Sequence, residues 1–225
     1  MKENTVKIKE LFSIEHTRAR DFFEQAEYPW EILPDLKKII GEIGRNLPAD
    51  IYDKRGEGVW IAKSARIADS AYIGVPCIIG ERSEIRHCAF IRSSALIGDD
   101  CVVGNSTELK NCILFDGVQV PHYNYIGDSI LGYKTHMGAG AITSNVKSDR
   151  SPVKIKFSDG ETYDTGLRKM GAALGDHVEV GCNCVLNPGT VIGRNSNVYP
   201  LSSVRGVILS DSIYKAADNI VSKRS

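Results

Sequence analysis

Aliphatic residues recur at every sixth position along most of this chain. A first run continues without a miss through Ile61, Ile67, Ile73, Ile79, Ile85, Ile91, Ile97, Val103, Leu109 and Phe115. A second run comprises Leu174, Val180, Leu186, Ile192, Val198 and Val204. Neither the 3.6-residue period of an α-helix nor the two-residue period of a strand produces a repeat of six by itself. The pattern predicts a parallel β-helix, in which short strands wind into stacked coils.

The residues between the aliphatic positions support the same fold. The position after each aliphatic residue is mostly Ala or Gly, and a small residue follows three positions later. Three six-residue units make one triangular coil of about 18 residues, whose parallel strands stack about 4.8 Å apart. We predict an all-β fold, a left-handed parallel β-helix of hexapeptide repeats, with a short helical N-terminal segment. The left hand is typical of hexapeptide-repeat proteins and departs from the usual right-handed crossover rule.

The first 50 residues do not carry the repeat. FSIEHTRARDFFEQA and PWEILPDLKKIIGEIG read as two short helices separated by Pro29, with Pro34 in the first turn of the second helix and Gly44 at its end. We expect this helical cap (1–50) to cover the open end of the prism, because a bare strand edge invites pairing. A linker (51–58), the β-helix (59–207) and a polar tail (208–225) follow.

The repeat is interrupted between its two runs. It slips near Pro121 to Leu131 and breaks over residues 143–173. Within that break, VKIKFSDGETYDTG predicts a hairpin around Asp159-Gly160 that projects from the prism as a loop. Regular repeats serve as scaffold, so function is expected where the regularity fails.

Composition excludes several classes of protein. Lys and Arg total 28 and so do Asp and Glu, which argues against a general nucleic-acid or membrane-surface binder. No apolar run approaches the roughly 20 residues of a membrane span, and MKENTVKIKELF lacks a signal core. The six cysteines have no metal-ligand spacing, so we predict no metal site. Cys77, Cys101 and Cys184 hold inward positions, which suits reduced thiols. A soluble cytoplasmic protein is expected.

Three cations stand where the repeat calls for a small residue: Arg86, Arg92 and Lys110. Arg92 and Lys110 are 18 residues apart, so we expect one coil to place them directly above each other. Two stacked cations repel unless an anion lies between them, and a phosphate suits an Arg fork beside a Lys point charge. The alternative is a solvated face on which Glu84 or Glu108 is the partner.

His122 lies at the slip, directly after Pro121. An imidazole titrates near working pH and suits a general base, although a loop histidine taken alone more often has a structural role. The remaining histidines form no ligand-like cluster: His16, His87, His136 and His177. No phosphate-binding glycine loop, G-x-S-x-G or H-E-x-x-H motif is present.

The stretch from Val103 to Asn145 reads VGNSTELKNCILFDGVQVPHYNYIGDSILGYKTHMGAGAITSN. It resembles the acetyltransferase half of the bifunctional N-acetylglucosamine-1-phosphate uridyltransferase/glucosamine-1-phosphate acetyltransferase family, whose pattern is VGNFVEIKNS–HLxYIGD–NIGAGTITxN. The later segment DTGLRKMGAALGDHVEVGCNCVLNPGTVIG resembles the archaeal sugar-1-phosphate nucleotidylyltransferase/acetyltransferases more closely. Together the resemblance covers about residues 59–207.

The resemblance implies a role for each matching position. The catalytic base falls on His122. The residues implied to bind the sugar phosphate are Arg92, Lys110, Tyr125 and Asn145. The co-substrate, acetyl-CoA, would meet the backbone near Ala139 and the positions around Cys182 and Pro200.

Three positions depart from the family pattern. His136 replaces an asparagine, Val146 replaces a frequent tyrosine, and the family's downstream lysine has no clear match except Lys154. These changes concern the identity of the sugar more than the acyl transfer.

The family's nucleotide-binding half, with its glycine-rich loop, has no counterpart here, so nucleotidyl transfer by this chain alone is not expected. The first hypothesis is acetyl transfer from acetyl-CoA to an amino-sugar phosphate such as glucosamine-1-phosphate, or to a nucleotide-linked sugar. One alternative is a non-catalytic sugar-phosphate or nucleotide-sugar binding or assembly module, related to UDP-N-acetylglucosamine pyrophosphorylase. Another is an acyltransferase of the same fold with a different acceptor.

The resemblance also implies an assembly. Relatives work as trimers with sites between prisms, so we expect a homotrimer in which loop 143–173 reaches a neighbour. A separate nucleotidyltransferase chain is a further candidate partner.

Overall fold

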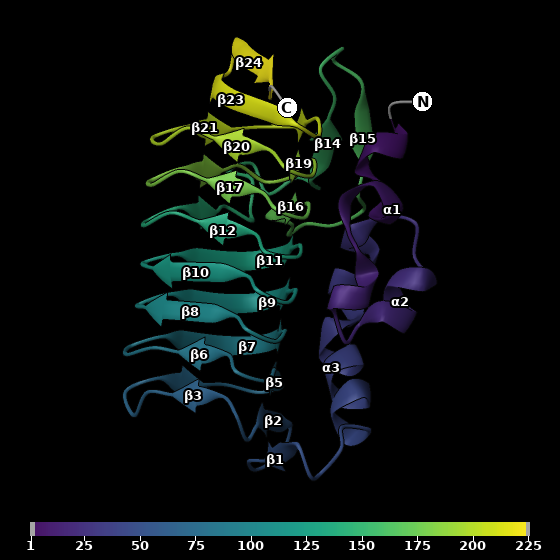
Figure 1. Ribbon diagram of the computed structural model, residues 1–225. Helices are drawn as coiled ribbons and strands as arrows, with labels where there is room; N and C mark the ends of the chain where they lie inside the picture. Colours follow the sequence, from purple (N-terminus) through teal and green to yellow (C-terminus); the bar gives the residue numbers. More distant parts are fainter. Residues whose placement is uncertain (1–2, 224–225) are drawn as a thin grey trace.

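Short parallel strands wind into stacked triangular coils in the computed structural model, which describes residues 3–223 (Figure 1). The aliphatic positions of successive coils pair in register: Ile61 lies beside Ile79, and Ile79 beside Ile97. These side chains are buried in the prism. The predicted left-handed parallel β-helix of hexapeptide repeats is confirmed.

The first face of the prism is one nine-stranded sheet. It consists of β3 (Arg66–Ile67), β6 (Glu84–Ile85), β8 (Val102–Asn105), β10 (Gln119–His122), β12 (His136–Met137), β17 (Glu179–Val180), β20 (Asn197–Val198), β23 (Ser212–Ala216) and β24 (Asn219–Ser222).

The second and third faces share a thirteen-stranded sheet, because β7 (Phe90–Ile97), β9 (Glu108–Leu114) and β11 (Tyr125–Leu131) bend around the corner between them. The second face also holds β4 (Tyr72–Ile73), β13 (Ile142–Thr143), β18 (Val185–Leu186) and β21 (Ser203–Val204). The third face also holds β1 (Tyr52–Lys54), β2 (Val59–Ala62), β5 (Cys77–Ile79), β16 (Ala172–Leu174), β19 (Thr190–Ile192) and β22 (Val207–Ile208).

The N-terminal helices lie along the side of the prism (Figure 1). They are η1 (Glu3–Val6), α1 (Ile8–Leu11), η2 (Ile14–His16), α2 (Arg20–Glu24), η3 (Pro29–Asp35) and α3 (Leu36–Arg45). Pro34 is inside the 3-10 turn η3, ahead of α3, and α3 continues through Gly44 to Arg45. The expectation that these helices cover the open end is wrong, since α3 contacts β5, β7 and β9 on the third face.

The reason for this placement is visible in the strands. Third-face strands are apolar on both sides, as in Ile78-Ile79, Leu96-Ile97 and Ile113-Leu114, all buried. One residue of each pair points into the prism and the other lies beneath the helices. Consecutive apolar residues of this kind are typical of strands that are covered on both faces. The sequence therefore indicates that the third face is covered by another part of the chain.

Two further segments differ from a plain coil. β14 (Lys154–Lys156) and β15 (Thr162–Asp164) form an antiparallel hairpin, with Asp159-Gly160 in the intervening turn. The expected polar tail instead continues the fold through β23 and β24, which pair antiparallel. None of the helices within residues 3–223 is long and apolar enough to cross a membrane.

Candidate active site

His122 ends β10 at the corner between the first and second faces, and three other predicted residues stand on the same corner. Backbone hydrogen bonds connect Asn105, His122, Ala139, Cys182 and Pro200 into one stack, which we call the His122 column. The carbonyl of each member except Pro200 accepts a hydrogen bond from the backbone N–H one residue beyond the next member; the His122 carbonyl, for example, accepts from the N–H of Gly140. These N···O distances are 2.8–3.0 Å. The residues that donate these hydrogen bonds have left-handed backbone angles, which turn the chain onto the second face: Tyr123, Gly140, Asn183 and Leu201.

The imidazole of His122 is exposed, and it has no hydrogen-bond or ion-pair partner within residues 3–223. The backbone below it is held firmly. Buried Asn124 accepts the His122 N–H at 3.1 Å and donates to the carbonyls of Gly138 and Ala141 at 2.8 and 3.0 Å. Sequence reasoning missed Asn124, whose role is to fix the backbone beneath the candidate base.

Ala139 and Cys182 offer backbone donors at this corner that no described residue uses. Gly138, Gly140 and Ala141 all use their N–H groups in backbone hydrogen bonds. The N–H of Ala139 makes none with any residue that the structure describes. An unused N–H beside a candidate base is the type of group that stabilises an oxyanion.

A second group of polar side chains gathers around Asp128, at the corner between the second and third faces. Both oxygens of Asp128 accept from Lys110 Nζ, at 2.8 and 2.9 Å, and Oδ1 also accepts from Asn111 at 2.9 Å. Asn145 Nδ2 donates to Asp128 Oδ2, and it also lies 3.2 Å from the hydroxyl of Tyr125. We call these five residues the Asp128 cluster. The side chain of Asp128 is only 5% exposed, so its carboxylate depends on these donors for solvation.

Tyr125 is half-buried, and its ring lies over Gly127, where a Cβ would come 2.4 Å from the hydroxyl. Burial, with a smaller contribution from Asp128, raises the pKa of Tyr125. The phenol is therefore neutral at ordinary pH and remains a hydrogen-bond donor. Sequence reasoning identified three members of the Asp128 cluster but not Asp128 itself, which the I-G-D motif places at an unusually polar corner position.

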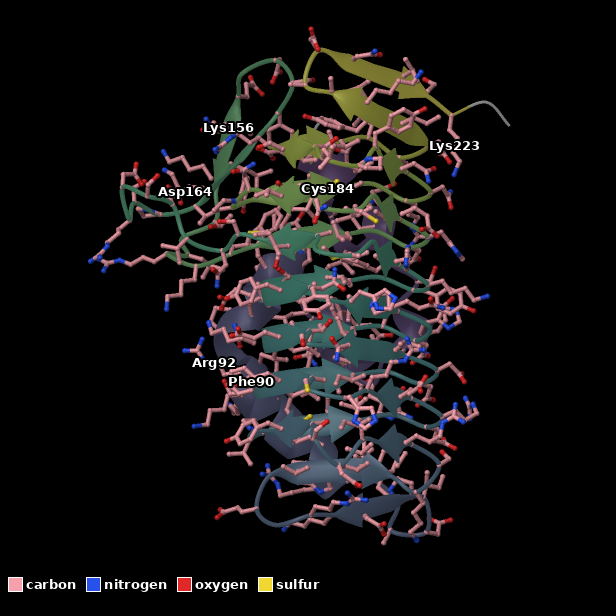
Figure 2. All side chains as sticks on the ribbon, turned by 90° about the vertical axis from the view of Figure 1, so that its left-hand side faces the viewer. Phe90, Arg92, Lys156, Asp164, Cys184 and Lys223 are labelled. Carbon is pink, nitrogen blue, oxygen red and sulfur yellow. The ribbon has the colours of Figure 1, made fainter. Side chains whose placement is uncertain are left out.

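Arg92 makes no hydrogen bond or ion pair with the other predicted site residues among those that the structure describes, although its charge acts on Tyr125. The parallel register shifts by one residue between Ile91 and Ser93, so Ser93 rather than Arg92 lies opposite Lys110. The expectation that Arg92 and Lys110 lie directly above each other is therefore wrong, because Arg92 is the extra residue of a bulge. Arg92 pairs with Glu108 at 3.4 Å, and its side chain is 56% exposed. Figure 2 shows it projecting outward beside Phe90.

The structure thus forms two groups at the two ends of the second face. His122, Ala139, Cys182 and Pro200 share one corner, whereas Lys110, Tyr125 and Asn145 meet at the other. No hydrogen bond or ion pair within residues 3–223 joins the two groups directly. An acceptor that spans the second face would touch both.

The departures from the family pattern have local partners. His136 Nδ1 lies 2.9 Å from Glu179, on the first face, and Lys154 lies 3.9 Å from Asp164 in the hairpin. Val146 is exposed. Among the described residues, no three His, Cys, Asp or Glu side chains are grouped to hold a metal ion.

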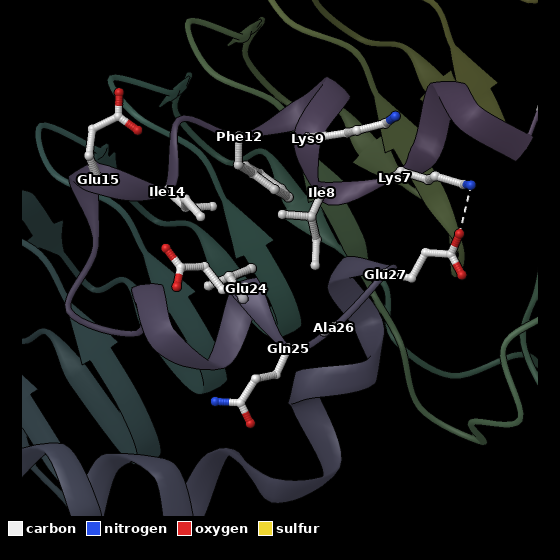
Figure 3. Close-up of a pocket in the computed structure, with 11 residues that line it drawn as sticks. Lys7, Ile8, Lys9, Phe12, Ile14, Glu15, Glu24, Gln25, Ala26 and Glu27 are labelled. Carbon is white, nitrogen blue, oxygen red and sulfur yellow. Dashed lines mark ion pairs between the residues drawn. The ribbon is translucent and has the colours of Figure 1, made fainter.

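A hollow of about 710 Å³ lies within the N-terminal segment (Figure 3). Ile8, Phe12 and Ile14 give it apolar walls, and Lys7 pairs with Glu27 at 2.6 Å at its rim. It contains none of the residues of the His122 column or the Asp128 cluster, so we do not place the candidate site there.

Similarity to known proteins is concentrated in the coils. A family profile described as the GMPPB C-terminal domain matches residues 76–157. The bifunctional sugar-1-phosphate nucleotidylyltransferase/acetyltransferase of Sulfurisphaera tokodaii is 35% identical over 88 residues, which are 39% of this chain and 22% of that protein. The bifunctional protein GlmU of Caldanaerobacter subterraneus is 35% identical over 179 residues, 72% of this chain and 35% of that protein.

Among solved structures, perosamine N-acetyltransferase from Caulobacter crescentus aligns with a TM-score of 0.38 at 14% identity, over 73% of this chain and 56% of that one. The resemblance to the bifunctional uridyltransferase/acetyltransferase family is confirmed by the sequence relatives. This chain spans only about a fifth to a third of the length of those relatives.

Proposed function

We propose that this protein is an acetyl-CoA-dependent acyltransferase whose acceptor is an amino sugar that carries a phosphate or a nucleotide. The observation that carries the proposal is the His122 column. It puts the candidate base, with its exposed imidazole, on the same prism corner as the three positions assigned to acetyl-CoA by resemblance. A cofactor lying along this corner would present its thioester to His122.

The chemistry follows from the groups at that corner. The acceptor nitrogen attacks the thioester carbon while the His122 imidazole takes its proton. The carbon–nitrogen bond forms, the carbon–sulfur bond breaks, and the imidazolium returns the proton to the departing thiolate. The unused N–H of Ala139 supports the negative charge on the thioester oxygen.

The Asp128 cluster suits the acceptor end of the reaction. The hydroxyl of Tyr125 and the amide of Asn145 lie together and offer hydrogen bonds to sugar hydroxyls or to the amine. The carboxylate of Asp128 holds Asn145 in place. Binding energy from this end of the second face would orient the amine toward His122.

A binding or assembly module is the second candidate. The carboxylate partners of Arg92 and Lys110 favour it, since paired cations suit a stable surface as well as they suit an active site. The third candidate, an acyltransferase of the same fold with a different acceptor, would use the same acyl-transfer chemistry. The homotrimer, the separate nucleotidyltransferase partner and the cytoplasmic location stay predictions.

Thiol release from acetyl-CoA, measured with a panel of amino-sugar phosphates led by glucosamine-1-phosphate, tests the proposal. We expect His122→Ala to reduce acceptor-dependent release at least ~10²-fold, as loss of a general base usually does. His87→Ala is the matched control, because His87 is exposed on the same corner, where its carbonyl accepts from the side chain of Asn105. An unchanged rate in His122→Ala would contradict the assignment. Silence of the folded wild type across the panel would favour the binding module.

A further inference from the structure

Asn124 interrupts a column of small residues at the corner that holds His122. The residue directly before each of the other second-face strands is Ala, Ser, Thr or Cys: Ala71, Ala89, Thr107, Ala141, Cys184 and Ser202. These positions stack because the strands that follow them pair in parallel. A regular coil needs only a small side chain here, so a residue that departs from the pattern is expected to serve the site.

The amide group of Asn124 connects two separate stretches of backbone. Its Oδ1 accepts the N–H of His122, while Nδ2 donates one hydrogen to the carbonyl of Gly138 and the other to the carbonyl of Ala141. Asn124 is 2% exposed, so these protein groups are its partners in place of water. The reverse orientation of the amide would set its NH2 group against the His122 N–H, so the network allows a single orientation.

The turn 138–141 carries the unused N–H of Ala139 and is held from both neighbouring coils. On one side the N–H of Gly140 donates to the carbonyl of His122 at 3.0 Å, and on the other the carbonyl of Ala139 accepts the N–H of Asn183 at 2.8 Å. A Cβ at Gly138 would come 2.7 Å from the nitrogen of Cys182, so the turn has little space to shift. Asn124 adds two hydrogen bonds to the one that Gly140 makes toward the coil of His122.

We propose that Asn124 is a positioning residue, which holds the imidazole of His122 and the N–H of Ala139 at the separation that acetyl transfer requires. This inference rests on the proposed function, in which His122 takes the proton of the acceptor and Ala139 supports the charge on the thioester oxygen. Both groups act on the same reacting centre, so their separation has to match that between the attacking nitrogen and the oxygen. Asn124 is buried and touches neither substrate. Its loss therefore slows the chemical step and leaves substrate binding unchanged.

The test compares two variants of the full chain, each of which removes one buried amide. Asn124→Ala gives this coil the residue that Ala89 and Ala141 already hold at equivalent positions, so the coil can still form. Asn187→Ala is the matched control, because Asn187 is also buried at a corner and donates to the carbonyl of Val204 at 2.9 Å. Within residues 3–223, no hydrogen bond or ion pair joins the Asn187 side chain to the His122 column or the Asp128 cluster.

Kinetics, stability and amide exchange are measured for the wild type and both variants. Thiol release with glucosamine-1-phosphate and acetyl-CoA gives kcat and the KM of each substrate. Thermal unfolding shows that each variant is folded at the assay temperature. Hydrogen exchange, followed by mass spectrometry in peptides that cover 138–141, reports how firmly the turn is held.

We expect Asn124→Ala to lower kcat at least ~10-fold, because a small displacement of a reacting group slows the chemical step strongly. Both KM values should change by less than ~2-fold, as they do when an interaction specific to the transition state is lost. Exchange at Gly140 and Ala141 should become at least ~10-fold faster, since their N–H groups bond within the loosened turn. Asn187→Ala should lower the melting temperature without either effect.

Equal losses of kcat in the two variants would overturn the inference, because activity would then follow stability instead of position. A higher KM with unchanged kcat would also overturn it, since Asn124 would then serve binding. Unchanged exchange in Asn124→Ala would overturn it whether or not the wild type is active. Wild-type protein that releases no thiol would overturn the proposed function, and faster exchange in Asn124→Ala would still support the link between His122 and the turn.

Discussion

Lys110 and Asp128 form a partly buried ion pair in which one ammonium group reaches both carboxylate oxygens, at 2.8 and 2.9 Å. The two residues lie on neighbouring coils, in β9 and β11. Asp128 also accepts from Asn111 and Asn145, so its charge is neutralised by several donors at once. This arrangement explains how a carboxylate whose side chain is 5% exposed remains inside a stack of apolar coils.

Breaking this pair from either side should destabilise the protein. We expect Asp128→Asn and Lys110→Met each to lower the free energy of unfolding by about 2–4 kcal/mol, because each leaves a partner without its opposite charge. The double variant should lose less than the sum of the two by about 1–3 kcal/mol. Chemical denaturation of the four proteins measures this coupling.

The ion pair between Lys154 and Asp164 provides the control cycle. Its atoms are 3.9 Å apart and both side chains are about half exposed, so the coupling should be under about 0.5 kcal/mol. If the two cycles gave equal coupling energies, Lys110 and Asp128 would have no special role in the fold.

The period of six was enough to predict the β-helix, because an aliphatic side chain in every unit has only one place to go in a triangular coil. Ile61, Ile79 and Ile97 pair as the period requires. The six-residue period does not predict the placement of the helices, because it marks only the residue of each unit that faces the prism interior. The second apolar residue of third-face strands, such as Ile78 or Leu96, is the one that contacts the helices.

The candidate site could be predicted only in part. Counting 18 residues from Arg92 reaches Lys110, but the coil is one residue shorter from Ser93 onward, and the bulge takes Arg92 out of register. The bulge does leave a mark in the sequence, because Leu109 and Leu114, which pair with Ile91 and Ile97, are five residues apart instead of six. Asp128 could not be predicted because its partners come from the coils on either side of its own: Lys110 and Asn111 lie on one, and Asn145 on the other.

Two glycines of α3 should respond to the same substitution with opposite signs. At Gly41 a Cβ would meet only Arg45, at 3.6 Å, so Gly41→Ala should stabilise the protein by about 0.5–1 kcal/mol through helix propensity. At Gly44 a Cβ would come 2.4 Å from the ring of Trp60. Gly44→Ala should therefore destabilise it by about 1–3 kcal/mol through overpacking. Thermal or chemical unfolding measures both changes, and equal effects would contradict the close packing of α3 on the third face.

Asp116 should make stability depend on pH. Burial raises the pKa of this carboxyl above its ordinary value of 3.8, so the folded protein binds a proton more tightly than the unfolded chain does. Stability is therefore lost as pH rises from about 3.8 through the raised pKa, and it stays lower at neutral pH. Asp116→Asn retains a side-chain oxygen that can accept a hydrogen bond from the Asp99 N–H, which lies 2.8 Å from Asp116 Oδ1 in the wild-type protein.

We expect Asp116→Asn to raise the melting temperature at pH 7 and to have no such benefit below pH 3.8, where the wild-type carboxyl is protonated in both states. The exposed Asp69 gives the control, Asp69→Asn, which should show no such pH-dependent gain. If Asp116→Asn instead lowered the melting temperature by the same amount at every pH, the contacts of the replaced oxygen would stabilise the folded protein by more than the buried charge destabilises it.

Cysteine alkylation can locate acetyl-CoA on the prism. Cys88 and Cys182 are exposed, whereas burial raises the pKa of Cys101 and Cys112 to about 12, which makes those thiols unreactive at neutral pH. Cys182 belongs to the His122 column, and Cys88 lies on the same corner, further down the prism.

If acetyl-CoA lies along the His122 column, saturating acetyl-CoA should slow alkylation of Cys182 by N-ethylmaleimide at least ~10-fold while Cys88 reacts at its original rate. Peptide mass spectrometry follows both sites in one sample, so Cys88 is the internal control. The slowing reflects occupancy of the corner, because a bound ligand protects only the surface that it covers. Equal protection of the two thiols would indicate a global change in the protein, and full reactivity of Cys182 at saturating acetyl-CoA would exclude this corner as the cofactor surface.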